Sequence, residues 1–361
     1  MKVAIGHFLF LNKVLMHTFL KTIPLVTTTL LSICITVYSQ NPDQVSVHIN
    51  DLQSITVEQY ELQISELLYV QPVGDYYVIV HRNQDGVSVM NGQGELKTQL
   101  GSTGRGPFEW QSPAFIEHHD GEIIIWDAGN LKFLIYDEDF EPVREEYGIQ
   151  YSIRGFSRKD QNVLAAFDQP GNENKFVYIY ENESNGRFTI NKTLGTLSEE
   201  GRMMLYIEMI GGVLWNGGDL LWVDPAVPGF FVYSTENESN KKITFHDEHF
   251  SVESWDEPPG MTQRAFQKLE KYLFSNSRVV SIQAIKEHIL IEVEHFQNGD
   301  PLITYHLFDF KYNNIGKVEA GEGGWMNYIR GVEGNRLYYW GEDYMETGLN
   351  RSIRVREIVV S

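Results

Sequence analysis

The sequence repeats a pattern of two short apolar runs joined by a turn. In five copies the second run ends in a residue whose side chain can bind a metal ion. These residues are His81, Asp127, Asp168, Asp224 and His295. Three carboxylates and two imidazoles at equivalent positions could direct ligands towards a shared cation, which would be Ca²⁺ if the carboxylates dominate and a transition metal if the histidines take part. The alternative, which we prefer, is that an Asp at the end of a strand accepts hydrogen bonds from its own turn.

A second set of polar residues stands in loops expected around the same positions: Arg82, Arg105, Asn130, Glu173, Glu342 and Asp343. In this set Arg105 lies between Gly104 and Gly106. Glycine lets the backbone approach a ligand closely, and a guanidinium group can clamp a carboxylate or a sulfate. An Arg in such a loop can instead bridge two neighbouring repeats, and we favour that simpler role. The glycines do not form a phosphate loop, because no Lys-Ser or Lys-Thr pair follows them.

Other arrangements of reactive residues are weaker. His246 and His249 flank Asp247 and Glu248 at a spacing that resembles a metal site. Because neither a helix nor a second cluster of ligands accompanies them, we expect a solvated turn there. The sequence has no G-x-S-x-G elbow and does not bring a Ser, a His and an Asp together with any specificity. The sequence therefore identifies no catalytic residue.

The element that would position all these residues is a repeated pair of strands. Each copy has a short apolar run, a turn, and a second apolar run that ends in Asn, Gly, Asp or Glu, with the enrichment in Ile, Val, Tyr, Phe and Trp that is typical of strands. The clearest copy spans residues 113–137. The second strands are predicted to begin near Asp75, Glu122, Asn162, Asp219, His288 and Arg336, which makes six copies.

Six copies predict an all-β fold, a six-bladed β-propeller whose blades are four-stranded antiparallel sheets. We expect a single domain over residues 40–361. A closed ring removes exposed strand edges, and closure usually needs both termini in one blade. The alternating segment 45–60 is therefore predicted to pair with the last blade, near residues 353–359.

One interval between copies is long and contains a helical pattern. After Pro258-Pro259-Gly260, the apolar residues Phe266, Leu269 and Leu273 recur on one face. Since almost every other segment has the pattern of a strand, we predict one helical insertion at about residues 258–275, between blades four and five.

The stretch GSTGRGPFEWQSPAFIEHHDGEIIIWDAGNLKFLIYD, residues 101–137, resembles an NHL repeat. The pattern of that repeat contains a glycine-rich turn, a Pro, an apolar strand, an Asp-Gly turn and two strands that end in Asp. Its positions are occupied here by Gly104, Gly106, Pro107, Pro113, Gly121, Asp127, Asn130 and Asp137, while Trp110 replaces the usual Phe. The resemblance implies a place among the NHL-like, TolB-like six-bladed propellers that are common among exported bacterial proteins.

The N-terminal segment, residues 1–39, is predicted to be a signal peptide. It carries three Lys and no acidic residue, and its uncharged stretch is interrupted by Thr and Pro, which suits a signal h-region better than a membrane span. Met16 is an alternative start. We expect export to the periplasm, the cell envelope or the medium. A lipid anchor on Cys34 is disfavoured because the bulky Ile33 precedes it.

Charge and composition narrow the function. The chain has 361 residues, 49 acidic against 29 basic side chains, and a formal charge of −20. Nucleic acid and anionic lipid are excluded as partners because both require clusters of Lys and Arg; membrane contact is expected only through an uncleaved signal segment. The sequence favours a non-catalytic exported propeller that binds a protein, a peptide or a glycan through the loops around its channel. The alternatives are a metal-assisted hydrolase or lyase that uses the Asp and His set, and a structural module of a cell-envelope assembly.

Overall fold

In the computed structural model of the protein, the described residues, which all lie between Ser46 and Ser361, belong to one compact unit. The predicted signal peptide at 1–39, the alternative start Met16 and Cys34 lie outside the residues that the structure describes. For residues 206–207, 263–266, 322, 343–345 and 348–350 only the backbone is described. The described ranges are 46–56, 67–81, 86–149, 153–168, 175–183, 186–207, 210–255, 263–297, 299–322, 328–345 and 348–361.

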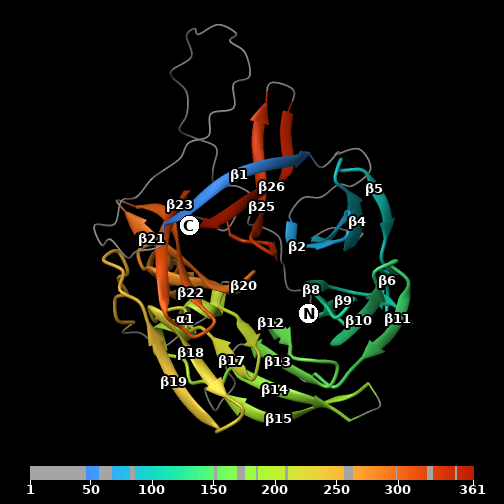
Figure 1. Ribbon diagram of the computed structural model, residues 1–361, viewed down its shortest axis with the longest axis horizontal. Helices are drawn as coiled ribbons and strands as arrows, with labels where there is room; N and C mark the ends of the chain where they lie inside the picture. The colour runs from blue at the N-terminus through green and yellow to red at the C-terminus, as the bar shows by residue number, and fades with distance from the viewer. Residues whose placement is uncertain are drawn as a thin grey trace, which may run out of the picture. The chain divides into compact units, whose positions relative to one another are not determined.

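Six four-stranded antiparallel sheets surround a central axis, so the fold is a six-bladed β-propeller, as predicted (Figure 1). In each blade the first strand named below forms the inner edge. Blade 1 contains β2 (Leu67–Val73), β3 (Tyr76–His81), β4 (Val87–Asn91) and β5 (Leu96–Gln99). Blade 2 contains β8 (Pro113–His119), β9 (Glu122–Asp127), β10 (Lys132–Asp137) and β11 (Pro142–Glu146). Blade 3 contains β12 (Ile153–Arg158), β13 (Val163–Asp168), β14 (Val177–Asn182) and β15 (Phe188–Leu194).

The second half of the chain continues the same arrangement. Blade 4 contains β16 (Val213–Asn216), β17 (Asp219–Trp222), β18 (Gly229–Ser234) and β19 (Ser239–Thr244). Blade 5 contains β20 (Arg278–Ile285), β21 (His288–Gln297), β22 (Asp300–Asp309) and β23 (Asn314–Glu322). Blade 6 contains β24 (Gly331–Glu333), β25 (Arg336–Met345), β26 (Gly348–Val360) and, from the N-terminal end, β1 (Val47–Thr56). A short parallel pair, β6 (Ser102–Thr103) and β7 (Glu109–Trp110), lies between blades 1 and 2 in the sequence.

The second strand of every blade begins within one residue of its predicted start. β9, β17, β21 and β25 begin at the predicted residues, and β3 and β13 begin one residue later. The pattern locates these strands because they are buried on both faces, as the apolar run of β9 illustrates. The turn between β8 and β9 is equally specific: Asp120 and Gly121 have φ angles of 51° and 77°, as a two-residue hairpin turn requires.

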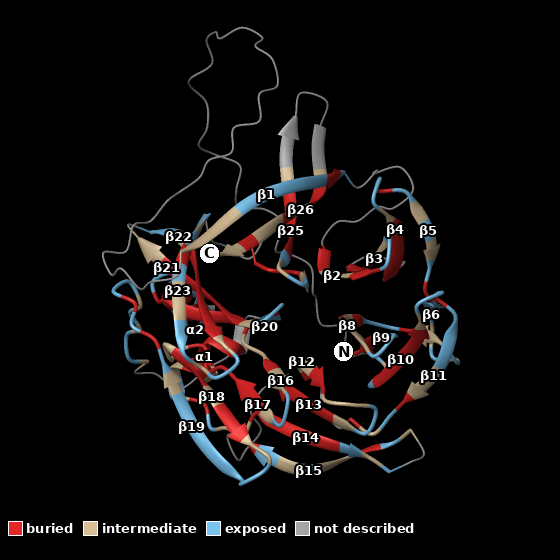
Figure 2. Ribbon diagram, in the orientation of Figure 1, coloured by how far each residue is buried: buried red, intermediate tan, exposed pale blue. Residues whose placement is uncertain are grey.

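β1 closes the ring in the predicted way. It pairs antiparallel with β26, from Val47 opposite Val360 to Thr56 opposite Ser352, and so becomes the outer strand of the last blade (Figure 1). Burial decreases outwards within the blades: β9 and β10 are buried, whereas β19 and much of β1 are exposed (Figure 2).

Within the described residues two helices connect blades, whereas one was predicted from the sequence. α2 (Gln263–Leu273) lies between blades 4 and 5, inside the predicted insertion at 258–275. α1 (Glu199–Ile207), between blades 3 and 4, was missed. Its N-terminus is capped by Ser198, whose Oγ accepts the N–H of Gly201 at 3.0 Å. A Ser followed by two Glu before an apolar run is the local signal that could have identified this helix.

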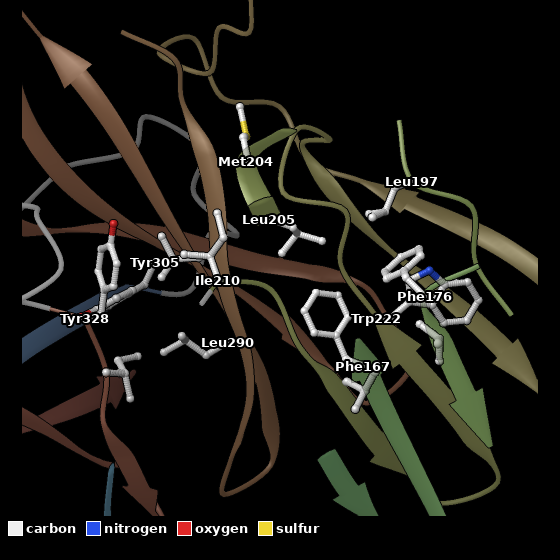
Figure 3. Close-up of a cluster of buried hydrophobic side chains, with 14 of the residues drawn as sticks. Phe167, Phe176, Leu197, Met204, Leu205, Ile210, Trp222, Leu290, Tyr305 and Tyr328 are labelled. Carbon is white, nitrogen blue, oxygen red and sulfur yellow. The ribbon is translucent and has the colours of Figure 1, made fainter. Parts of the chain in front are cut away.

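The largest apolar cluster joins blades 3 to 6 and includes α1. Figure 3 shows Met204 and Leu205 of α1 near Leu197, Ile210 and Trp222, all of which are buried. The helix therefore completes the packing between blades and does not stand apart as a separate module. In the described part of the chain, no helix combines the length and the apolar character that crossing a membrane demands.

Candidate functional site

The inner strands of the blades surround a cavity of about 310 Å³, which we call the channel cavity. Its lining comes from all six blades and includes Tyr69, Glu117, Arg154, Leu214, Gln283 and Arg330. This volume lies at the lower end of the range that is typical of small-molecule sites. Each side chain is positioned by a different blade, so the ring as a whole holds the site.

Glu117, in β8, links the inner strand of blade 2 to that of blade 3. Its two carboxyl oxygens accept the backbone N–H of Arg158 at 3.1 and 3.3 Å. Burial raises the pKa of Glu117 to about 8, although the hydrogen bond from Arg158 and the charge of that residue act to lower it. At neutral pH the carboxyl group is therefore mostly protonated, and it can donate a hydrogen bond as well as accept one.

Arg154 occupies an irregular position in β12. Ile153 pairs with Asp168 and Gly155 pairs with Phe167, so Arg154 is left out of the ladder, as in a β-bulge. Burial lowers the pKa of its guanidinium group, and the negative charge of Asp168 acts in the opposite direction. Because an Arg stays protonated even so, this position supplies a cation that is largely withdrawn from bulk water.

Arg330 is fixed by the backbones of two blades. Its N–H donates to the carbonyl of Tyr338 in blade 6 at 2.7 Å, and its own carbonyl accepts the N–H of Val70 in blade 1 at 2.8 Å. The positive charge also acts on Tyr69: burial raises the pKa of that phenol to about 12, while Arg330 acts to lower it. The second cation of the cavity is thus placed where blade 6 meets blade 1.

Glu292, in β21, is an acidic residue whose pKa the charge of Arg330 acts to lower. Its oxygens accept the Ser281 hydroxyl at 2.8 Å and the N–H of Ile329 at 3.1 Å. Burial raises the pKa of Glu292 to about 7, against the lowering effects of these hydrogen bonds and of Arg330. Around neutral pH the carboxyl group is therefore only partly ionised, and it offsets only part of the positive charge of Arg330.

The loop residues that we predicted to bind a ligand do not line the channel cavity where the structure describes them. Arg105 is exposed. Asn130 donates through Nδ2 to the carbonyl of Gly104 at 2.9 Å, and Glu342 accepts the Nε–H of Arg351 at 3.1 Å. Arg82 and Glu173 lie outside the described residues, and only the backbone of Asp343, in β25, is described. A ligand role for these residues stays a prediction.

The glycine-rich loop around Arg105 has a local explanation. The N–H of Gly106 donates to Oε2 of Glu109 at 2.6 Å, and a Cβ at Gly104 would lie only 1.9 Å from the same oxygen. The loop therefore wraps around a carboxylate of its own chain, which accounts for the glycines without a bound ligand.

The strand-end carboxylates Asp127 and Asp224 accept hydrogen bonds from nearby backbone, as in our preferred interpretation. Asp127 Oδ1 accepts the N–H of Ser112 at 2.7 Å and that of Gly129 at 3.1 Å. Asp224 Oδ2 accepts the N–H of Ser198 at 2.7 Å, while Oδ1 accepts that of Ala226 at 3.1 Å. Burial raises the pKa of Asp224 despite these bonds. Both residues hold together the connections between strands and blades.

The five candidate metal ligands lie one in each of blades 1 to 5, and the structure does not bring them together. His81 Nε2 lies 3.0 Å from Ser88 Oγ, Asp168 lies beside Arg154, and His295 takes part in the network described next. Among the described residues, no three His, Cys, Asp or Glu side chains are grouped so that they could hold a metal ion. The described residues therefore do not bring together the ligands that a Ca²⁺ or transition-metal site would need.

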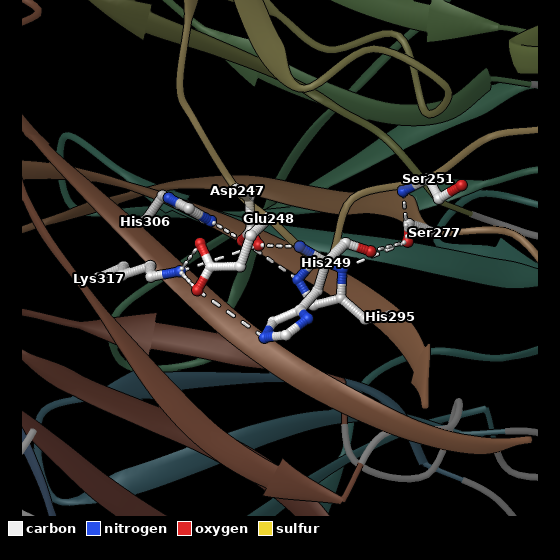
Figure 4. A network of polar contacts seen from close by, with 8 residues as sticks. All are labelled: Asp247, Glu248, His249, Ser251, Ser277, His295, His306 and Lys317. Atoms are coloured by element: carbon white, nitrogen blue, oxygen red, sulfur yellow. Dashed lines mark hydrogen bonds and ion pairs between the residues drawn. The ribbon is translucent and has the colours of Figure 1, made fainter. Parts of the chain in front are cut away.

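A buried network around Asp247 joins the segment after blade 4 to blade 5 (Figure 4). Asp247 Oδ2 lies 2.7 Å from Nε2 of His306 and 3.2 Å from Nε2 of His295, and Oδ1 accepts the N–H of His249 at 3.0 Å. Burial alone would raise the pKa of Asp247, but the hydrogen bonds from His295 and His306 outweigh it and hold that pKa well below its usual range. The solvated turn that we expected is therefore wrong at Asp247, although Glu248 beside it is exposed.

Ser277, His295 and Asp247 resemble a hydrolase triad in composition. Ser277 Oγ lies 3.3 Å from Nδ1 of His295. However, the Ser277 hydroxyl donates to the carbonyl of His249 at 3.0 Å and accepts the N–H of Ser251 at 3.1 Å, and the residue is buried. Because its proton is committed to a carbonyl oxygen, the hydroxyl group fastens the connecting segment and is not prepared as a nucleophile.

Sequence reasoning missed Glu117, Arg154 and Arg330, which supply the cavity's carboxyl group and its two guanidinium groups. A charged residue inside a predicted strand was the available signal, and Glu117 carries it because it stands in the inner run of the clearest copy. Arg154 gives no such signal. The register of β12 shifts at this residue, so the regular alternation from which a strand is predicted is interrupted there. Arg330 precedes a strand of three residues, which is too short to show a pattern.

Comparison with known proteins agrees with this architecture. Residues 48–207 match the DUF5128 family model, which is described as a 6-bladed beta-propeller. No curated protein matches the sequence.

Two solved structures from Bacteroides share the fold at low sequence identity. A protein from Bacteroides fragilis named as an exported protein is 12% identical, with a TM-score of 0.58 over 86% of this chain and 95% of its own. A member of the DUF4221 family from Bacteroides vulgatus is 9% identical, with a TM-score of 0.60 over 87% of this chain and 99% of its own. At such identities the likeness extends to the fold alone, and the fold is that of a six-bladed β-propeller.

Proposed function

We propose that the protein is an exported, non-catalytic binding propeller that holds a small-molecule ligand, or the end of a peptide or glycan, in the channel cavity. The observation that carries this proposal is the convergence of all six blades on one cavity of about 310 Å³. Its lining combines apolar and aromatic side chains, such as Leu214 and Phe115, with polar and charged ones, such as Gln283 and Arg154, and polar groups in a cavity can fix the orientation of a ligand. The strand-end Asp residues and Ser277, in contrast, are engaged in contacts that hold the fold together.

The proposal also includes export of the protein and a relationship to the TolB-like propellers. The uncharged stretch in residues 1–39 supports a signal peptide, and a protein of the same fold is named as exported. The NHL-like stretch at 101–137 supports a relationship to the TolB-like propellers. A site inside the ring suits an exported protein, because the closed fold shelters the ligand site without a second domain.

The cavity offers a direct experiment at Gly155. This residue lines the cavity, and a Cβ added there would meet no atom within 4 Å. Gly155→Phe should therefore fill the cavity without disturbing the backbone. We would measure thermal shifts of the wild-type protein and the variant with a panel of monosaccharides, dipeptides and small organic acids. A ligand at about 100 times its Kd stabilises a protein by roughly 2.7 kcal/mol, and Gly155→Phe should lose that gain.

Gly92→Phe is the matched control, since a Cβ at Gly92 also meets nothing within 4 Å and the residue lies in an exposed turn between β4 and β5. It should respond to every compound as the wild type does. If a compound stabilises wild type and Gly155→Phe equally, its site lies outside the channel cavity. If no compound in the panel stabilises the wild type, the proposed function itself loses its support.

A further inference from the structure

The charges of the channel cavity contrast with the charge of the whole chain. Acidic residues exceed basic ones by 20 in the sequence. The cavity lining nevertheless contains two arginines, Arg154 and Arg330, against one carboxyl group, that of Glu117. Because Glu117 is mostly protonated at neutral pH, it adds a hydrogen-bond donor and little negative charge. The cavity therefore attracts anions within an otherwise acidic molecule.

The two arginines stand on opposite walls. Arg154 belongs to blade 3, while Arg330 directly precedes the inner strand of blade 6. Two blades separate them in either direction around the ring (Figure 1), and yet both line the same cavity. A ligand with acceptors at its two ends therefore suits both guanidinium groups.

Each arginine already has partners within the fold. The acidic residues whose charges interact with them include Asp168 for Arg154 and the partly ionised Glu292 for Arg330. The oxygens of Glu292 already accept bonds from Ser281 and Ile329. A guanidinium group has five N–H donors in a planar fork, so an arginine that has partners within the fold can still offer donors to a carboxylate.

We infer that the channel cavity binds a small dicarboxylate, with one carboxylate on Arg154, the other on Arg330, and Glu117 donating a hydrogen bond to the ligand. This inference rests on the proposed function, since it names the ligand class of the same site. Carboxylates suit the site because planar guanidinium groups match their geometry, and because burial reduces competition from water at both arginines.

The experiment compares succinate with its half-amide, succinamate, and its diamide, succinamide, by isothermal titration calorimetry on the full chain at constant ionic strength. The three compounds are nearly equal in size and differ in charge. Succinate should bind most tightly, and each replaced carboxylate should weaken the Kd by about tenfold or more, because a charge-assisted hydrogen bond is lost. Equal binding of succinate and succinamide would overturn the inference.

Variants locate the site. Arg154→Gln and Arg330→Gln should each weaken succinate binding by about tenfold or more and bring it close to that of succinamate. Arg336→Gln is the control, because Arg336 begins β25, its side chain is 51% exposed, and it lies outside the cavity lining. The affinity of this variant for succinate should equal that of the wild type. Should a Gln variant fail to fold, Arg154→Lys and Arg330→Lys keep the charge and should bind with intermediate affinity. Succinate binding that neither arginine affects would contradict the inference.

Failure of this inference can be distinguished from failure of the proposed function. If no dicarboxylate binds, but a sugar or a dipeptide stabilises the wild type and not Gly155→Phe, the cavity is a ligand site of another class and only the dicarboxylate is rejected. If succinate and every compound of the panel leave the wild type unchanged, both are rejected.

Discussion

Glu117 carries a carboxyl group whose ionisation opposes folding. Its pKa in the folded protein is about 8 because of burial, whereas a Glu in an unfolded chain titrates near pH ~4.3. The unfolded state therefore releases this proton first as the pH rises. The contribution of Glu117 to stability is fully present below about pH 4 and is lost as the pH rises through about 8.

Glu117→Gln keeps an acceptor for the Arg158 N–H and removes the titration. Between about pH 5 and pH 8.5 the wild type should lose unfolding free energy relative to this variant, on the order of 2 kcal/mol once screening by water in the cavity is allowed for. Urea unfolding across this pH range measures the difference. The control is Glu141→Gln on an exposed turn, which makes the same chemical change outside the cavity. Parallel curves for wild type and Glu117→Gln would show that the carboxyl group is not protonated in the fold.

Among the elements, the central strands and the inner strand β8 could be predicted from the sequence, whereas the inner strands β12 and β24 could not. β9 is a continuous apolar run between two turns, so pattern alone locates it. β12 and β24 mix polar residues, glycine and short length, and they acquire their place only when the ring closes. The candidate site depends on those inner strands, which is why Arg154 and Arg330 were not foreseen although the fold was.

The segment between blades 4 and 5 depends in the same way on contacts made by the folded chain. Asp247 fastens it to His295 of β21 and His306 of β22. Asp247→Asn should cost about 3 kcal/mol of unfolding free energy, because removal of one member of a buried charged network leaves its partners unsatisfied. The contribution of Asp247 to the free energy of unfolding should be present above about pH 4 and be lost at lower pH, because the pKa of Asp247 is lowered in the folded protein.

Glu248→Gln provides the neighbouring control for Asp247→Asn. Glu248 pairs with Lys317 at 3.0 Å, but its side chain is 58% exposed, so the change should cost less than about 1 kcal/mol. Guanidinium chloride unfolding of both variants gives the comparison. Equal costs at Asp247 and Glu248 would mean that the network does not hold the segment.

Over the whole molecule, stability is distributed around the ring. Apolar clusters lie between blades 1 and 2, between blades 2 and 3, through blades 3 to 6, and between blades 6 and 1. The last cluster depends on a strand from the other end of the sequence, because Ile55 of β1 packs with Trp340 and Ile353 of blade 6. Opening this one interface would convert the ring into an open array and would separate the walls of the channel cavity.

Ile55→Ala therefore probes the closure of the entire propeller. Ile55 is 4% exposed, while Leu52 in the same strand is 45% exposed. Removal of the buried side chain should cost about 3 kcal/mol, and the same truncation at Leu52 should cost less than about 1 kcal/mol. Hydrogen exchange should show lost protection in both blade 6 and blade 1, because closure couples them. If protection falls only within β1, the strand frays alone and the ring remains closed by its other contacts, in which case ligand affinity at the channel cavity should also be unchanged.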